Sequence, residues 1–142
     1  MEFITVEQFL EQPEEVQETF LDWWECKLFD IYAWFWDFPE HLNIESCVNK
    51  IQADSINRGK TINKGKAIDD IIPLFTEGQL RRFIEESTYT KIIVNKSDDK
   101  QYIIALILDN DEVYNMVDTE TDDLLQAYWK VACMIAKEEL DG

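Results

Sequence analysis

Residues 91–108 read KIIVNKSDDKQYIIALIL, and this stretch decides the fold. Two runs rich in β-branched and apolar residues, Lys91 to Lys96 and Gln101 to Leu108, flank a short polar connection, which predicts two antiparallel strands. The second run is apolar on both alternating sides, as a central strand would be. A third strand is expected after the turn at 109–111 and should run through Val117. The sequence therefore predicts an antiparallel meander.

Capping signals mark the expected helices. Thr5 to Gln8 and Thr76 to Gln79 both fit a capping box, in which the threonine accepts from a backbone N–H three residues on and the glutamine reaches back. The first box predicts an acidic helical segment from Val6 to Trp24. A last helix is expected to start at Thr119 or Thr121, the two candidate N-caps.

The remaining segments complete the expected fold. Residues 28–38 are aromatic and β-prone, which predicts a strand, whereas residues 43–53 fit either a short helix or a strand. Residues 57–66 contain two glycines and four basic residues and predict a basic loop. We therefore expect an α+β fold: an antiparallel sheet of about four strands with about three helices packed on it, in a single acidic domain spanning residues 1–142.

Composition places the chain among folded proteins. It has 142 residues, of which 46% are hydrophobic and 13% aromatic, so it can build a core despite its charge. It opens with Met1-Glu2 and has no apolar run long enough to span a bilayer, so we expect neither export nor a membrane association. The three cysteines, Cys26, Cys47 and Cys133, form no C-x-x-C pair, which favours buried, reduced thiols in a cytoplasm.

The net charge of −17 is the outlying property of the composition. Residues 1–45 carry twelve acids and one base, residues 46–66 one acid and five bases, and residues 67–142 seventeen acids and seven bases. Such a chain repels nucleic-acid backbones and is attracted to basic surfaces. We therefore expect a basic protein surface as partner and no direct contact with nucleic acid.

The sequence offers little for catalysis. His41 is the only histidine, no serine or cysteine lies in a nucleophile motif, and neither of the usual glycine-rich phosphate-binding motifs is present. We therefore expect no enzyme, no catalytic residue and no cofactor. Asp109, Asp111 and Glu120 match three positions of a calcium loop, but Tyr114 stands where that loop requires a glycine, so no metal site is expected either.

Three short segments carry a resemblance. Residues 72–80 read IPLFTEGQL, residues 123–130 read DLLQAYWK and residues 21–24 read LDWW. These segments resemble those of small acidic proteins of phages and prophages in Gram-positive bacteria. The resemblance implies a phage accessory protein acting in the cytoplasm of the host cell. Small acidic proteins in that setting are often inhibitors of host defence nucleases, with anti-CRISPR proteins as the best-known example.

These observations lead to a functional hypothesis. Carboxylates spaced along a helix can imitate the phosphates of a nucleic acid and occupy a basic channel. We expect an inhibitory binding protein that blocks a nucleic-acid-handling host enzyme, such as a CRISPR nuclease, by docking its acidic face there. Trp34 and Trp36 share one strand face and are candidate anchors. The expected contacts are Glu7, Glu11, Glu14, Glu15, Glu18, Asp22, Trp34, Trp36, Asp109, Asp111, Glu112, Asp118, Glu120, Asp122 and Asp123.

Other interpretations of the same residues stay open. The acidic helix face also fits a solvated surface that only confers solubility, and the tryptophans also fit a core. The alternative function is a phage structural or assembly protein that self-associates by pairing its aromatic strand with a copy of itself. Monomer and small homo-oligomer are both compatible with the sequence.

Overall fold

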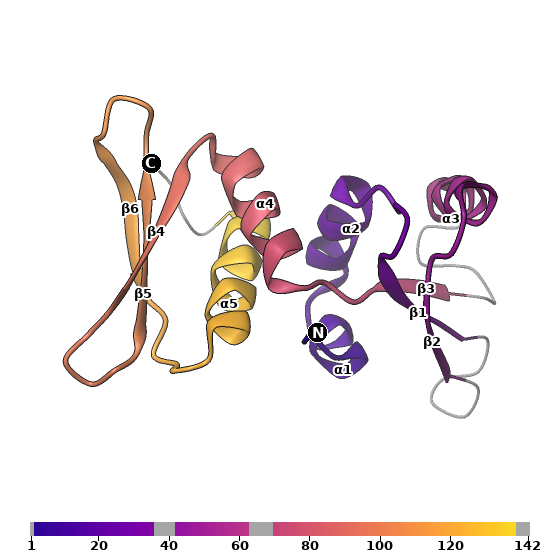
Figure 1. The fold of residues 1–142 in the computed structure, drawn as a ribbon, viewed down its shortest axis with the longest axis horizontal. Helices are drawn as coiled ribbons and strands as arrows, with labels where there is room; N and C mark the ends of the chain where they lie inside the picture. The colour runs from indigo at the N-terminus through magenta and orange to yellow at the C-terminus, as the bar shows by residue number, and fades with distance from the viewer. Residues whose placement is uncertain (1, 36–41, 63–69, 139–142) are drawn as a thin grey trace. The chain divides into compact units, whose positions relative to one another are not determined.

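The computed structural model describes residues 2–35, 42–62 and 70–138 (Figure 1). The chain groups into two compact units: Thr5–Leu74, here the N-terminal unit, and Met1–Ile4 with Phe75–Gly142, here the C-terminal unit. The N-terminal unit contains α1 (Val6–Leu10), α2 (Glu14–Trp23), β1 (Ile31–Phe35), β2 (Leu42–Ser46), α3 (Lys50–Ile62) and β3 (Asp70–Pro73). The C-terminal unit contains α4 (Glu77–Thr88), β4 (Lys91–Lys96), β5 (Tyr102–Ile107), β6 (Val113–Asp118) and α5 (Leu124–Ala136).

The expected acidic helix from Val6 to Trp24 consists of two helices. The predicted capping box at Thr5 and Gln8 is present, with both reciprocal hydrogen bonds, and it starts α1. α1 ends after five residues, and Pro13 then takes the N-cap position of α2. A proline cannot donate a backbone hydrogen bond and restricts the residue before it, so the helix is interrupted at this point.

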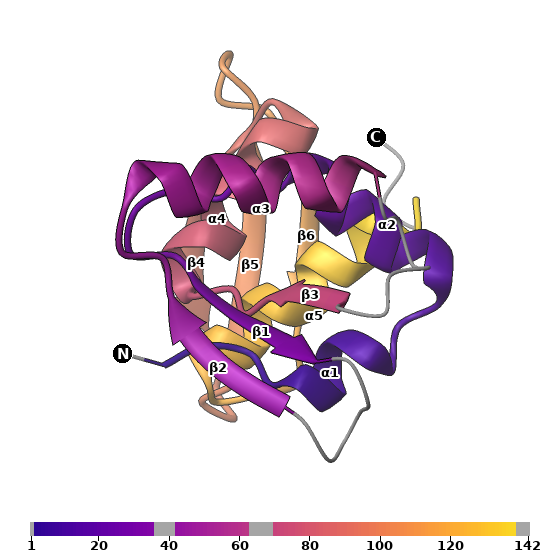
Figure 2. The ribbon, with the colours of Figure 1, turned by 90° about the vertical axis from the view of Figure 1, so that its right-hand side faces the viewer.

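β1 is the central strand of the sheet in the N-terminal unit. It pairs antiparallel with β2 along one edge and with β3 along the other, as Figure 2 shows. The expected pairing of this aromatic strand with a second copy is therefore wrong, because both edges of β1 are already occupied. Trp34 is half-buried, opposite Asn43 on one neighbour and Ile71 on the other. Trp36 lies outside the described residues.

Residues 42–62 form both a strand and a helix. β2 and the start of α3 resolve the ambiguity over residues 43–53, and α3 continues to Ile62, so the predicted loop at 57–66 is wrong for residues 57–62. Residues 63–66 lie outside the described part. The Asn49 side chain accepts from the Gln52 N–H (2.8 Å), and the Gln52 side chain accepts from the Val48 N–H (2.9 Å). These caps stabilise the start of α3 and offset the destabilising effect of the glycine in its interior.

The C-terminal unit is a three-stranded sheet with two helices on one face (Figure 1). The second predicted capping box, Thr76 with Gln79, starts α4. β5 lies between β4 and β6, which confirms the prediction of a central strand. Its buried side chains Ile104 and Leu106 face α4 and α5 together with Ile92 of β4. α5 has Asp123 as its N-cap, because the Asp123 carboxylate accepts from the Gln126 N–H (3.0 Å).

The structure confirms some of the sequence predictions and corrects others. The α+β class is confirmed, but within the described residues there are two three-stranded antiparallel sheets and five helices, not one sheet of about four strands with three helices. Neither Thr119 nor Thr121 caps α5, since the Thr119 hydroxyl donates to the Tyr102 carbonyl (2.7 Å). All three cysteines are buried and form no disulfide, as predicted. That the chain unfolds as one domain stays a prediction.

Candidate partner-binding site

α1 and α2 carry most of the carboxylates that the sequence assigned to a partner. The structure leaves all six exposed, as expected: Glu7, Glu11, Glu14, Glu15, Glu18 and Asp22. The opposite stripe of α2 is buried, with Val16 and Phe20 in the core and the Phe20 ring 6.4 Å from that of Phe9. At 100° per residue, Glu14 and Glu18 lie about 180° from Val16 and Phe20. The amphipathic pattern of α2 therefore fixes which way these glutamates point.

The glutamates of α1 and α2 are not used to hold the fold together. Glu14 and Glu18 are one turn apart, a spacing at which like charges repel. Residues 1–26 contain no lysine or arginine. Within the part of the chain that the structure describes, the five glutamates listed above make no side-chain hydrogen bond or ion pair; the recorded ion pairs, Arg81–Glu85 and Arg82–Glu86, lie in α4. These carboxylates are therefore available to an external cation.

The Gln17 side chain links α2 to the end of α1, in addition to the core contact between Phe9 and Phe20. The Gln17 amide of α2 donates to the carbonyl of Gln12 (2.8 Å) and, at longer range, to that of Leu10 (3.4 Å). Both carbonyls belong to the end of α1 and the connection after it, where no further helical turn satisfies them. Gln17 therefore holds the two glutamate-bearing helices relative to each other, so that the backbone positions of the glutamates are fixed.

The acidic residues of the C-terminal unit do not form a single cluster. Asp109, Asp111 and Glu112 lie in the turn before β6, whereas Asp118 and Glu120 follow at its other end, roughly 17 Å away for a six-residue strand. The predicted contact region from Asp109 to Asp123 is thus divided between two ends of the sheet. Asp122 and Asp123 are exposed at the second end.

The same end of the sheet holds two aspartates that sequence reasoning missed. Asp98 and Asp99 lie in the turn between β4 and β5, which is placed beside residues 119–121 by the hydrogen bond from the Tyr102 N–H to the Thr121 carbonyl (2.8 Å). The position of these two aspartates could have been predicted, because a meander brings its first turn next to the end of its third strand. Lys96 and Lys100 lie close by in the chain, so charge at this end is partly balanced.

The calcium-loop positions are likewise separated by β6, with Asp109 and Asp111 before the strand and Glu120 after it. Among the described residues no group of three or more His, Cys, Asp or Glu side chains could hold a metal ion. The expected absence of a metal site stays a prediction, which calorimetry with calcium would test.

An exposed apolar corner lies in the N-terminal unit, where no sequence pattern indicated one. Its members are Leu28, Phe29, Val48 and Ile51, with exposed fractions of 49%, 75%, 66% and 80%. The Phe29 N–H donates to the Cys47 carbonyl (2.7 Å), which places residues 28–29 beside residues 47–48, and Ile51 lies in the first turn of α3 that follows. Large apolar side chains gathered in this way mark interaction sites more often than isolated ones do.

Phe29 is held in a conformation that costs free energy. Its φ of 71° lies in the left-handed region, which usually takes glycine or asparagine. Asp30 holds the turn, because its carboxylate accepts from the Lys27 N–H (2.9 Å) and from the Trp24 indole (3.1 Å). Strained backbone at a residue that contributes nothing to the core is a pointer to function.

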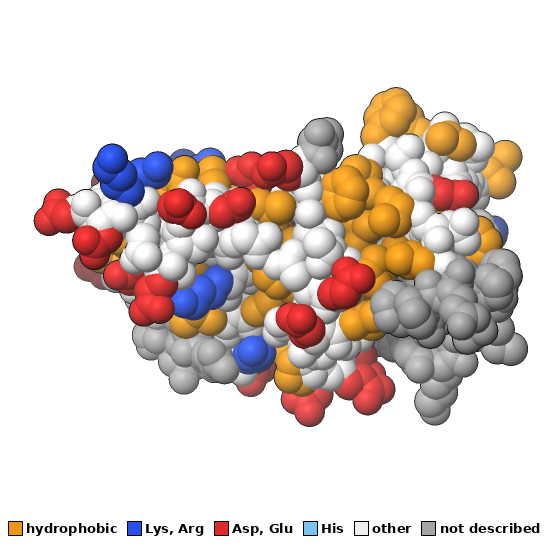
Figure 3. Space-filling model, turned by 90° about the horizontal axis from the view of Figure 1, so that it is seen from below, with side chains coloured by type: hydrophobic (Ala, Val, Ile, Leu, Met, Phe, Trp, Pro, Cys, Tyr) orange, Lys and Arg blue, Asp and Glu red, His pale blue; other side chains and the backbone are white. Residues whose placement is uncertain are grey.

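The observed anchor therefore differs from the expected ones. Trp34 is half-buried on the central strand, and Trp36 lies outside the described residues, whereas Phe29 projects from a turn. Figure 3 shows carboxylates spread over one face of the molecule, with apolar side chains gathered at several places. The sequence placed Phe29 in a strand over residues 28–38, which is wrong for residues 28–30, because β1 begins only at Ile31. A turn without glycine or proline at its centre gives no strong local signal.

Comparison of the chain with protein-family models, with curated proteins and with solved structures gives no match. A search of the described helices finds none with the length and apolar character needed to cross a membrane.

Proposed function

We propose that this chain is an inhibitory binding protein that docks the glutamates of α1 and α2 on a basic, nucleic-acid-binding surface of another protein and thereby blocks it. The observation that carries the proposal is the set of five exposed, unpaired glutamates on two short helices fixed to each other by Gln17. Because the two helices are held together, binding needs to order only the glutamate side chains, and their contacts with arginine or lysine are strong when water is excluded.

The exposed apolar corner in the same unit supplies what charge alone does not. Electrostatic attraction mainly raises the rate of association, whereas most binding energy comes from a few buried aromatic or aliphatic anchors. Phe29, with Val48 and Ile51 beside it, is suited to that role. A surface that served solubility alone would require neither a strained turn nor an exposed aromatic side chain.

The resemblance to phage proteins makes a CRISPR nuclease the first target to test. A purified Cas9-type nuclease loaded with guide RNA would be titrated with this chain while the fluorescence anisotropy of labelled target DNA is followed. The proposal predicts that DNA is displaced at about one chain per nuclease. It also predicts that displacement weakens as salt rises from about 0.05 to 0.5 M, because exposed charges are screened beyond about 10 Å at 0.1 M.

A nuclease that keeps its DNA at every concentration would exclude this target. The chain would then be immobilised and its partners recovered from a host lysate, with a variant in which Glu7, Glu11, Glu14 and Glu18 are changed to glutamine as the comparison. The proposal requires a nucleic-acid-binding protein that is retained by the natural chain and lost with the variant. Equal recovery on both would contradict it.

A further inference from the structure

One face of the β4-β5-β6 sheet is largely apolar and is not covered by any described helix or strand of the C-terminal unit. α4 and α5 lie on the other face, where Ile92, Ile104 and Leu106 are buried. On the open face the middle row runs from Ile93 through Ala105 to Met116, and Ile93 and Met116 are 49% and 59% exposed. The flanking rows are completed by the half-buried side chains of Ile103 and Ile107 and by exposed Val113.

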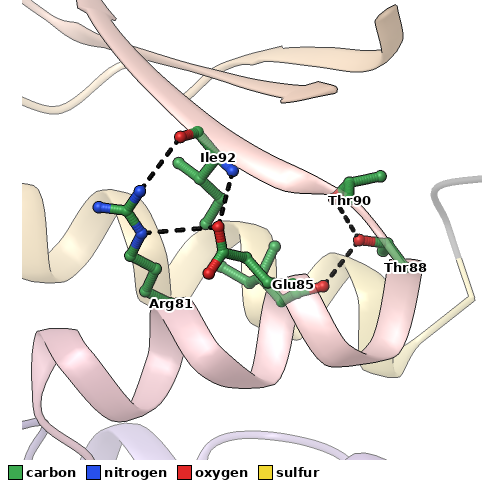
Figure 4. A network of polar contacts seen from close by, with 6 residues as sticks. Arg81, Glu85, Thr88, Thr90 and Ile92 are labelled. Atoms are coloured by element: carbon green, nitrogen blue, oxygen red, sulfur yellow. Dashed lines mark hydrogen bonds and ion pairs between the residues drawn. The ribbon is translucent and has the colours of Figure 1, made fainter. Parts of the chain in front are cut away.

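The edges of this sheet are already protected. At the β4 edge the Glu85 carboxylate accepts from the Ile92 N–H (2.9 Å), the Arg81 guanidinium donates to the Ile92 carbonyl (3.2 Å), and the two side chains form an ion pair (3.7 Å), as Figure 4 shows. On β6 the Asn115 side chain accepts from the Met116 N–H (2.8 Å). Because these backbone groups are occupied, addition of another strand at either edge is disfavoured.

Charges stand at two opposite corners of the open face. The pairing register places Lys91, Ile107 and Val113 in the row at one end, and Asn95, Ile103 and Asp118 in the row at the other. Lys91 and Asp118 therefore lie at the two ends of one diagonal, on different edge strands. Both side chains are exposed. A second copy of the same face can meet both charges only in certain orientations.

We propose that the open face binds a second copy of this chain, face to face, about a two-fold axis along the diagonal from Asn95 to Val113. This axis sets each Lys91 against the partner copy's Asp118 and places apolar side chains on apolar side chains, with the two Ala105 residues meeting at the centre. Axes along or across the strands pair each charge with an uncharged residue. An axis along the other diagonal sets like charges together. The strands then cross at about 90°, which is one of the two usual ways for sheets to pack.

The size of the face indicates a weak dimer. Three strands about 4.8 Å apart and six residues long present roughly 15 Å by 17 Å, so the total buried surface is on the order of 1,000 Å², the lower limit for a specific interface. Each chain also carries a net charge of −17, which opposes association. The dimer therefore forms at high protein concentration and strengthens with salt, because screening of the net repulsion outweighs the loss of two exposed ion pairs.

Sedimentation equilibrium over a concentration series tests the proposal. The natural chain should show a monomer–dimer equilibrium, and both Ile93→Lys and Met116→Lys should weaken it at least tenfold by placing a charge against apolar side chains of the partner copy. Thermal melts confirm folding. Ile93 and Met116 are 49% and 59% exposed, so neither lysine is placed in the core, and either variant alone suffices. Ile44→Lys is the matched control, since it makes the same change at a 54% exposed isoleucine of β2, outside this face.

The control should leave the dimer intact. A chain that stays monomeric up to about 1 mM would overturn the proposal, as would a dimer that Ile44→Lys breaks and Ile93→Lys does not. The charge pair gives a second test. Lys91→Glu and Asp118→Lys should each weaken the dimer several-fold, and the double variant should restore it to within about threefold. Additive losses in the double variant would contradict the diagonal axis.

Discussion

α2 and α4 are helices of similar length that use their carboxylates in opposite ways. In α4, Glu85 pairs with Arg81 and binds the Ile92 backbone, and Glu86 pairs with Arg82, so acid and base are matched one turn apart. In α2, Glu14, Glu15 and Glu18 have no base within the helix and no partner among the described residues. Glu85 and Glu86 of α4 thus contribute contacts within the fold, whereas Glu14, Glu15 and Glu18 of α2 contribute none among the described residues.

The largest expected effect on stability is at Glu85. Glu85→Ala should lower the free energy of unfolding by about 2 kcal/mol, because it leaves the Ile92 N–H without its acceptor and removes the ion pair with Arg81. Glu18→Ala on α2 should change it by less than about 0.5 kcal/mol, since alanine is a good helix former and no contact is lost. Urea unfolding measures the free energy of unfolding of both variants. Equal decreases would contradict the different roles of the carboxylates in the two helices.

The next effect concerns two exposed aromatic residues in the left-handed conformation, one in each unit. Phe29 has a φ of 71° and Tyr89, the C-cap of α4, a φ of 55°. Changing either to glycine should raise the free energy of unfolding by up to about 1 kcal/mol, because glycine adopts this conformation without strain. Only Phe29→Gly should weaken partner binding. If Tyr89→Gly weakened it equally, the apolar corner would have no special role.

Alkaline pH should destabilise both units, because each contains a buried acid with a raised pKa. Burial raises the pKa of Cys133 to about 12 from 9.0, and burial with the hydrogen bond to Glu45 raises the pKa of Tyr32 to about 12 from 10.0. The folded chain keeps these protons while the unfolded chain loses them. Stability is therefore complete below about pH 9 and falls as pH rises toward 12.

Thermal melts between about pH 8 and 11 follow this loss. Cys133→Ala should make the fall shallower from about pH 9, and Tyr32→Phe only above about pH 10, because the two groups have different ordinary values. An unchanged profile in both variants would show that other groups govern alkaline stability.

The features that the sequence predicted correctly are the ones determined by neighbouring residues. Thr5 with Gln8 and Thr76 with Gln79 form their caps within four residues, and the exposure of Glu14 and Glu18 follows from the helical period alone. The Asn49 and Gln52 cap of α3 was equally local, but the glycine further on in the helix favoured a loop.

The features that were missed depend on contacts between distant segments. One expected sheet became two because β1 pairs with β3, some forty residues later in the chain, and no local pattern specifies that choice. The exposure of Phe29 depends on the backbone pairing with Cys47 and on Asp30 holding the turn. Half of the candidate site, the glutamates, could thus be predicted from sequence, and the apolar corner could not.

The most direct test compares two variants with the same change in charge. In one, Glu7, Glu11, Glu14 and Glu18 become glutamine; in the other, the exposed residues Asp54, Asp98, Asp99 and Glu138 become their amides. Affinity for the nuclease, or for the partner recovered from the host lysate, would be measured by calorimetry at low salt. The account predicts a loss of more than about tenfold, or ~1.4 kcal/mol, for the first variant alone, with melting temperatures close to the natural chain's in both. Equal affinities in the two variants would assign the charge of α1 and α2 to solubility and contradict the proposed function.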